Sequence, residues 1–239
     1  MRSWSLSAIL LLAAIQADAS MAIYLPALGS LDAGWARHFL RNGINHFNYG
    51  EYVYSLEELD NAVSHAPSPA VAAYARMYKA RGFYALHNPS KARAEFEQVF
   101  RLAPDSALFY AIAGSAAFKA GQLDDAQSFF ERGLKVGSGH DLLLNNFAWF
   151  RATCPDGRFR NGGQAVKFAR QACDLAKWKD SAFLDSLAAA QAESGDFRAA
   201  AATQQRALSD KDAERLDRVE AEARLHSYLQ GQPYRAKTG

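Results

Sequence analysis

Cysteine and histidine are too scarce and too scattered in this chain to build a metal centre. Its 239 residues include two cysteines, Cys154 and Cys173, and six histidines, none of which lies four residues from another histidine or from a cysteine. A structural zinc site needs four nitrogen or sulfur ligands held close together. We therefore expect no bound metal.

Motifs for catalysis and cofactor binding are also missing. The sequence contains no Gly-x-Ser-x-Gly elbow, no His-Glu-x-x-His pair and no dinucleotide-binding fingerprint. Adjacent acidic pairs such as Asp124-Asp125 point about 100° apart on a helix, so they do not converge on a substrate. The sequence predicts a protein that is not an enzyme and has no cofactor.

Neither sign of charge is in large excess, so the net charge does not indicate the class of partner. The chain has 27 basic and 25 acidic residues, a net charge of +2. Residues 151–180 carry a local excess of basic side chains, which could hold an anionic polymer but which we interpret as a solvated helix face. We expect no nucleic-acid partner.

Long apolar runs are confined to the first residues. The run from Leu6 to Ile15 is followed by Ala17-Asp18-Ala19, the small-x-small pattern that precedes signal-peptide cleavage. The alternative of an uncleaved anchor fits less well, because a spanning helix needs about 20 apolar residues. We predict a signal peptide over residues 1–19, export to the periplasm or the medium, and no membrane span in the mature chain.

A repeated pattern runs through most of the remaining sequence. The segments "YAIAGSAAFKAGQLDDAQSFFERGL" (110–134) and "LDSLAAAQAESGDFRAAAATQQRAL" (184–208) each read as two amphipathic helices around a glycine turn. Weaker copies of the same pattern precede them at matching intervals. Five small residues mark the equivalent position in each second helix, at intervals of 37, 34, 39 and 35 residues: Ser55, Ala92, Ala126, Ala165 and Ala200. The pattern predicts an all-α array of helical hairpins.

With their Gly-acid-aromatic turns, alanine anchors and closing prolines, these segments resemble the tetratricopeptide repeat (TPR) family. The resemblance covers about residues 35–209 and implies a right-handed superhelical solenoid of about five hairpins. Residues 20–34 are then a linker, 210–230 a capping helix and 231–239 a tail. In the cap we expect Leu216, Val219, Ala223 and His226 to share the inward face, and charged residues, Arg224 among them, to face solvent.

A narrower resemblance covers residues 144–235. An Ala-Trp pair, a Cys-Pro-Asp turn, an Ala-Cys helix, a Trp-Lys-Asp link and a final Pro-Tyr-Arg occur together here, as in a group of bacterial TPR proteins. It implies a bacterial source and no particular activity.

The stretch "CPDGRFRNGGQAVKFARQAC" (154–173) admits four interpretations: a metal site, a disulfide loop, an anion cradle or an overlong turn. Cys173 would lie about 11 residues into a helix, roughly 16 Å along its axis, whereas a disulfide needs Cα atoms within about 7 Å. The glycines could present amides to an anion, but no Walker lysine follows. We favour a five-residue insertion in the turn of repeat four, with two buried packing thiols.

Function in such an array is expected on the concave groove lined by the first helix of each repeat. The repeat phase places twelve residues near it: Arg37, Asn48, Tyr74, Met77, Arg81, Tyr84, Ser115, Phe118, Lys119, Asn145, Trp149 and Asp185. Of these, we expect the partner-binding set to be Arg81, Tyr84, Phe118, Lys119, Asn145 and Trp149, although each aromatic could instead pack between repeats.

These residues suit an acidic or aromatic-bearing peptide, since aromatic residues and arginine dominate interface energies. The sequence therefore predicts a non-catalytic adaptor of the bacterial envelope that binds a protein or peptide partner. A structural subunit that self-associates through its convex face or its edge remains an alternative.

Overall fold

The computed structural model describes residues 31–209 and 216–238, with the backbone alone for residues 31–33. The predicted signal peptide, residues 20–30 of the predicted linker and residues 210–215 of the predicted cap lie outside these ranges. The described residues form α-helices, one short 3-10 turn and loops. Within these same ranges no helix is both long and apolar enough to cross a membrane.

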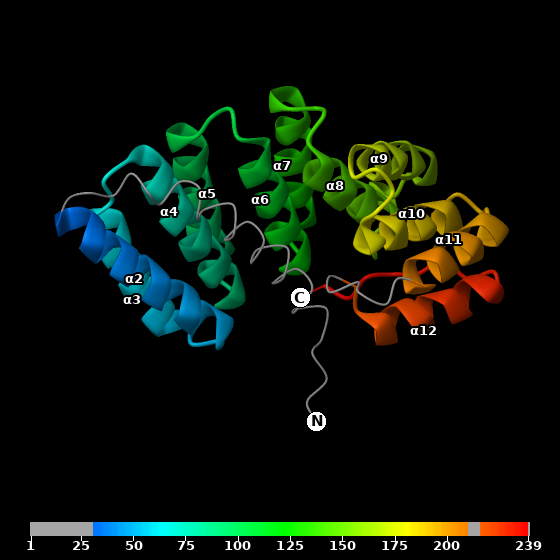
Figure 1. Cartoon of the computed structure of the whole chain (residues 1–239), viewed down its shortest axis with the longest axis horizontal. Coiled ribbons are helices and arrows are strands. Elements are labelled where there is room, and N and C mark those ends of the chain that lie inside the picture. The colour runs from blue at the N-terminus through cyan, green and yellow to red at the C-terminus, as the bar shows by residue number, and fades with distance from the viewer. Residues whose placement is uncertain (1–30, 210–215, 239) are drawn as a thin grey trace.

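The helices alternate along the chain as the first and second members of five hairpins (Figure 1). The first helices are α2 (Leu31–Asn48), α4 (Pro69–Ala85), α6 (Ala107–Lys119), α8 (Asp141–Thr153) and α10 (Ser181–Glu193). The second helices are α3 (Tyr52–Ser64), α5 (Pro89–Leu102), α7 (Leu123–Val136), α9 (Gly162–Leu175) and α11 (Phe197–Ser209). α12 (Arg218–Leu229) follows the fifth hairpin.

Several helices begin or end where the sequence supplies a local reason. Asn88 and Asn161 cap α5 and α9 by accepting hydrogen bonds from backbone N–H groups of the first turn. Gly50, Gly121 and Gly195 have φ of +80°, +71° and +89° between the helices of their hairpins. Only glycine adopts this left-handed conformation without strain, which explains the recurring turn glycine.

The five small anchor residues of the second helices are all fully buried, as the repeat register requires. At the first of them, Ser55 replaces the usual alanine, and its hydroxyl donates a 2.8 Å hydrogen bond to the carbonyl of Gly43. A Cβ built on Gly114 would lie 2.5 Å from the Phe130 ring. Small residues therefore set the close approach of the two helices, and the predicted array is confirmed as an all-α solenoid.

The hairpins stack into an arch whose two ends are the α2–α3 hairpin and α12 (Figure 1). First helices pack against first helices from one repeat to the next, as α6 does with α8 and α8 with α10. Beyond α12 the chain turns back and runs as an irregular segment toward the inner side of the arch. This segment, residues 232–238, is called the tail below.

The capping helix differs from the prediction in its register. Within the described residues it begins at Arg218, and Ala221, Arg224 and Tyr228 form its buried face. Val219, Ala223 and His226 are exposed, contrary to the expectation that they face inward, whereas Leu216 is buried as expected. Arg224, expected in solvent, is 2% exposed, because its guanidinium pairs with a buried carboxylate on α10.

Candidate functional site

The tail identifies which helices form the inner side of the arch. Its residues contact α8 and α10, both first helices, and Figure 1 shows it on the concave side. The contacted residues lie at the last turns of these helices, where Trp149 and Thr153 belong to α8 and Glu193 ends α10. We call this line of helix ends, from α10 toward α2, the concave track.

Trp149 is covered by the tail. The Tyr234 ring lies 5.7 Å from the Trp149 ring, centroid to centroid. The Arg224 guanidinium lies 5.4 Å from each of the two rings, within the range of a cation–π contact. The sequence placed Trp149 on the concave side, but its neighbour there is the chain's own C-terminal segment.

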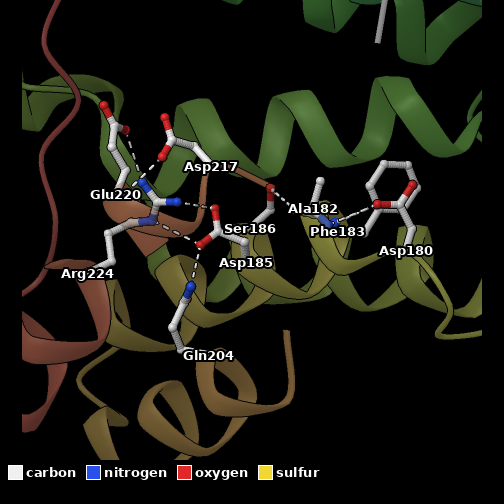
Figure 2. A network of polar contacts seen from close by, with 9 residues as sticks. All are labelled: Asp180, Ala182, Phe183, Asp185, Ser186, Gln204, Asp217, Glu220 and Arg224. Atoms are coloured by element: carbon white, nitrogen blue, oxygen red, sulfur yellow. Dashed lines mark hydrogen bonds and ion pairs between the residues drawn. The ribbon is translucent and has the colours of Figure 1, made fainter. Parts of the chain in front are cut away.

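A bidentate ion pair holds Arg224 in place (Figure 2). Nε donates to Asp185 Oδ1 and Nη2 to Asp185 Oδ2, both at 2.9 Å. Gln204 of α11 donates a 2.6 Å hydrogen bond to Asp185 Oδ1, and Glu220 lies on the solvent side of the guanidinium. Burial, the largest single influence, lowers the pKa of Arg224, but Asp185, Tyr228 and Tyr234 together outweigh it and raise that pKa above its usual value.

Glu193 joins the tail to the long turn of repeat four. Its Oε2 lies 2.7 Å from Arg235 Nη1 in an ion pair, and its Oε1 accepts a 3.0 Å hydrogen bond from Arg160 Nε. Arg160 also donates to the carbonyls of Cys154 and Pro155. A Cβ on Gly162 would lie 2.7 Å from the Ser194 nitrogen, so this turn packs directly on the end of α10.

The long turn is therefore a packing element, which was the favoured interpretation of its sequence. Phe159, in the 3-10 turn Gly157–Phe159 (η2), is buried against Phe150. Both cysteines are free and buried. Burial raises the pKa of the Cys173 thiol to about 12, and the charges of Asp174 and Asp180 add to the shift. Among the described residues, no group of His, Cys, Asp and Glu side chains is arranged to hold a metal ion.

Arg81 and Lys119 share the other half of the concave track. Arg81, in the last turns of α4, stacks over the rings of Phe47 and Tyr78 at 4.5 and 4.7 Å, and its Nη1 lies 4.0 Å from the Met77 sulfur. Lys119 ends α6 and reaches solvent. Partial burial lowers the pKa of Lys119, and the positive charge of Arg81 lowers it further.

Neither cation forms an ion pair with a carboxylate in the part of the chain that the structure describes. Most other buried or half-buried cations of the array do, as Arg76 and Lys79 do with Glu95. Two neighbouring positive charges without a counter-charge form a surface that favours an anionic ligand.

The remaining predicted site residues lie inside the array. Tyr84 is 5% exposed and packs on Phe96 of α5. Phe118 is 7% exposed and meets the edge of Phe150 of α8. Phe118 therefore packs between repeats, the alternative that the sequence left open, whereas Tyr84 packs within its own hairpin. Asn145 is also buried and donates a 3.3 Å hydrogen bond to Asn146.

Two features of the site had no role assigned from the sequence. Pro-Tyr-Arg was visible as part of a recurring pattern, but nothing local indicates that Tyr234 docks on Trp149. Asp185 was placed near the groove, whereas its partner Arg224, 39 residues further along, was placed in solvent. The spacing of Ala221, Arg224 and Tyr228 places all three on one face of a helix, which is the sequence signal that could have indicated a buried Arg224.

Known proteins share this architecture. No family model and no curated protein matches the sequence. TTC0263, a thermophilic TPR protein from Thermus thermophilus, superposes with a TM-score of 0.60 at 19% identity, over 82% of this chain and 99% of its own. MamA gives a TM-score of 0.51 at 13% identity, over 73% of this chain and 91% of MamA.

A chain of the Cut9–Hcn1 hetero-tetramer of the APC/C gives a TM-score of 0.57 at 16% identity, over 82% of this chain and 39% of that chain. At these identities the likeness concerns the fold. The chain has the helical-hairpin solenoid architecture of TPR proteins.

Proposed function

We propose that this protein is a non-catalytic interaction module that binds an extended acidic segment of a partner protein on the concave track, through Arg81 and Lys119. One observation carries the proposal: the charge of Arg81 reaches Lys119 and lowers its pKa, and neither cation pairs with a carboxylate of the described residues. Solenoids of stacked hairpins use their concave side as an extended binding surface.

The partner's chemistry follows from the surroundings of the two cations. Arg81 is held by Phe47 and Tyr78, so its guanidinium loses little side-chain freedom when a carboxylate binds. Like-charge repulsion between Arg81 and Lys119 is relieved when an anion lies between them. We therefore assign a segment with at least one aspartate or glutamate to this part of the track.

A displayed library of random peptides tests this assignment. Selection on the wild-type protein should enrich acidic sequences, and the best synthetic peptide should bind at least tenfold more weakly to the Arg81→Glu/Lys119→Glu variant. Reversing Lys167 and Arg198, exposed cations on α9 and α11, is the matched control and should leave affinity unchanged. Enriched peptides without acidic residues, or unchanged affinity in the folded double variant, would contradict the proposal.

We place this module in the bacterial cell envelope, on the basis of the apolar run and cleavage pattern of residues 1–19 and of the bacterial TPR pattern over residues 144–235. Cleavage should leave Ser20 as the first residue of the exported protein. N-terminal sequencing of the envelope fraction checks this. An intact Met1 on cytoplasmic protein would exclude export.

Exposed side chains on the first repeat favour a second candidate, a subunit that self-associates through the edge of the array. Tyr49, Val53 and Tyr54 are between 62% and 82% exposed at the start of the second helix or just before it. Large apolar side chains gathered on a surface indicate an interaction site. Light scattering should then detect a dimer that Tyr54→Glu dissociates; a monomer at all concentrations removes this candidate.

A further inference from the structure

The tail has the features of a peptide bound to the array. Gly231, with φ of +71°, ends α12 and reverses the chain. Residues 232–238 then run without regular secondary structure along the last turns of α10 and α8. The segment follows the inner side of the arch in Figure 1.

Three kinds of contact hold the tail. Tyr234 packs on Trp149 and lies within reach of the Arg224 guanidinium. Arg235 forms its ion pair with Glu193. The Ala236 N–H donates a 2.8 Å hydrogen bond to the carbonyl of Thr153, the last residue of α8. An aromatic anchor, a charge pair and a main-chain hydrogen bond are the means by which proteins bind extended segments.

The receiving surface is held together without the tail. Asp185 and Gln204 fix the guanidinium that faces Tyr234. Arg160 orients Glu193 from the opposite side. A surface organised before its ligand arrives loses little conformational freedom on binding, so the site can be vacated and refilled without refolding the array.

We propose that Trp149, Thr153, Glu193 and Arg224 form a second peptide-binding site, which the tail fills in cis. An extended segment of another protein, carrying an aromatic residue directly followed by arginine or lysine, exchanges with the tail at this site. The recognition elements are those that the tail already uses: the Trp149 ring for the aromatic residue, Glu193 for the cation and the Thr153 carbonyl for the next N–H group.

This site is distinct from the acidic-segment site of the proposed function. Glu193 selects a cation, whereas Arg81 and Lys119 select an anion, so the two ligands have opposite charge. Failure of binding at one site leaves the other untouched.

Release of the tail in the full-length chain, followed by titration with a synthetic tail peptide, tests the proposal. The Tyr234→Ala/Arg235→Ala variant keeps every residue of the receiving surface. Fluorescein-labelled peptide GQPYRAKT, residues 231–238, should bind it with one-to-one stoichiometry. The wild-type chain should bind the same peptide at least tenfold more weakly, since a tethered tail competes at an effective concentration in the millimolar range.

The controls lie in the peptide, which removes any effect on folding. Peptides with Ala in place of Tyr234, or Glu in place of Arg235, should each bind at least tenfold more weakly than the tail sequence. Absence of binding to a variant whose circular dichroism matches wild type would overturn the proposal. Equal binding of all three peptides would do so too.

A measurement on the unmodified chain guards against a variant that fails to fold. Unlabelled GQPYRAKT in excess should accelerate hydrogen exchange of the Ala236 amide, because displacement breaks its bond to Thr153. The Arg-to-Glu peptide should leave this rate unchanged. Exchange that does not respond to the tail peptide would show a fixed structural segment. A wild-type dimer lost in Tyr234→Ala/Arg235→Ala would assign the site to a second copy, and overturn exchange with another protein.

Discussion

Removal of either partner of the Asp185–Arg224 pair should destabilise the C-terminal end of the array at least as much as removal of both. The pair is bidentate, with both distances at 2.9 Å, and Arg224 and Asp185 are 2% and 6% exposed. Asp185→Ala leaves a guanidinium buried with only Glu220 nearby, 3.4 Å from Nη1 on the solvent side. Most of the expected loss of stability therefore comes from a guanidinium left buried without its counter-charge. The lost attraction between the two side chains is the smaller part.

The expected magnitudes follow from this burial. Breaking a buried pair by removing one partner costs about 3–5 kcal/mol, whereas replacing both partners by apolar residues of similar volume is often neutral or stabilising. We expect Asp185→Ala and Arg224→Met each to fall in that range. The Asp185→Leu/Arg224→Met variant should lose the contacts of Arg224 with Trp149 and Tyr234, about 1 kcal/mol each. It also leaves the buried Gln204 amide without its acceptor, at a cost of about 1–3 kcal/mol, so its total loss stays well below the sum of the two single substitutions.

Urea unfolding followed by far-ultraviolet circular dichroism and by tryptophan fluorescence measures these differences. Two probes are needed, because a repeat array can unfold from one end without a single transition. Arg132 and Glu97 provide the matched control: they also form an ion pair, but their side chains are 35% and 39% exposed. Glu97→Ala should cost less than about 1 kcal/mol.

Either of two results would refute this reasoning. If the two single substitutions cost less than about 1 kcal/mol each, the guanidinium must be hydrated in solution. If the double variant loses as much as the two single variants together, the two side chains are not energetically coupled and no orphaned charge is involved.

Three other outcomes are expected. Gly162→Ala should lower the free energy of unfolding in urea by about 1–3 kcal/mol. The new Cβ would meet the backbone of Glu193 and Ser194 at 2.8 and 2.7 Å. Gly163→Ala is the control and should not destabilise the protein, because there is space around that position. Cys154 and Cys173 should stay unreactive toward a thiol reagent in the native protein and react after unfolding, because burial raises both pKa values; rapid labelling of native protein would contradict their packing. Burial lowers the pKa of His140 in the fold. The unfolded chain therefore binds that proton more tightly, and the contribution of His140 to stability is present above about pH 6.5. It is lost as the pH falls through the folded pKa. His140→Asn replaces the ring nitrogen that accepts from the Leu143 N–H by an amide oxygen, so it should flatten that part of the pH profile.

Repetition made the array predictable from sequence. One small residue in a helix is weak evidence, but five of them at intervals of 34 to 39 residues define a register, and all five are fully buried. The turn glycines are also a local signal, because a backbone position with positive φ favours glycine whatever lies elsewhere in the chain. Both signals depend on neighbours within one hairpin, which a sequence displays directly.

The cap register was not predictable from apolar spacing. Val219 and Ala223 were expected inward, yet the buried face contains Arg224 because Asp185 lies opposite it on α10. A charge is buried only where a partner exists elsewhere in the chain. The hydrophobic pattern of a helix contains no information about such a partner.

The positions of the site residues also depend on contacts that lie far apart in the sequence. Tyr84 and Phe118 fit a binding surface by residue type, but they fill the space between α4 and α5 and between α6 and α8. Small register differences decide whether a first-helix aromatic faces the groove or the next repeat. The docking of Tyr234 on Trp149 joins residues 85 positions apart and depends on how α12 ends.

The charge of the concave track changes sign along its length. Glu193 attracts Arg235 at the end of α10, and the tail then passes Thr153 at the end of α8. The next helix end is Lys119, followed by Arg81 on α4. The tail's own next cation is Lys237, so its advance toward Lys119 would bring like charges together without a counter-ion. The tail contacts the helix ends of repeats four and five, and the cations of repeats two and three suit a ligand of the opposite charge. A single partner that occupied the whole track would need acidic residues at one end and an aromatic–basic pair at the other, which fixes its direction along the arch.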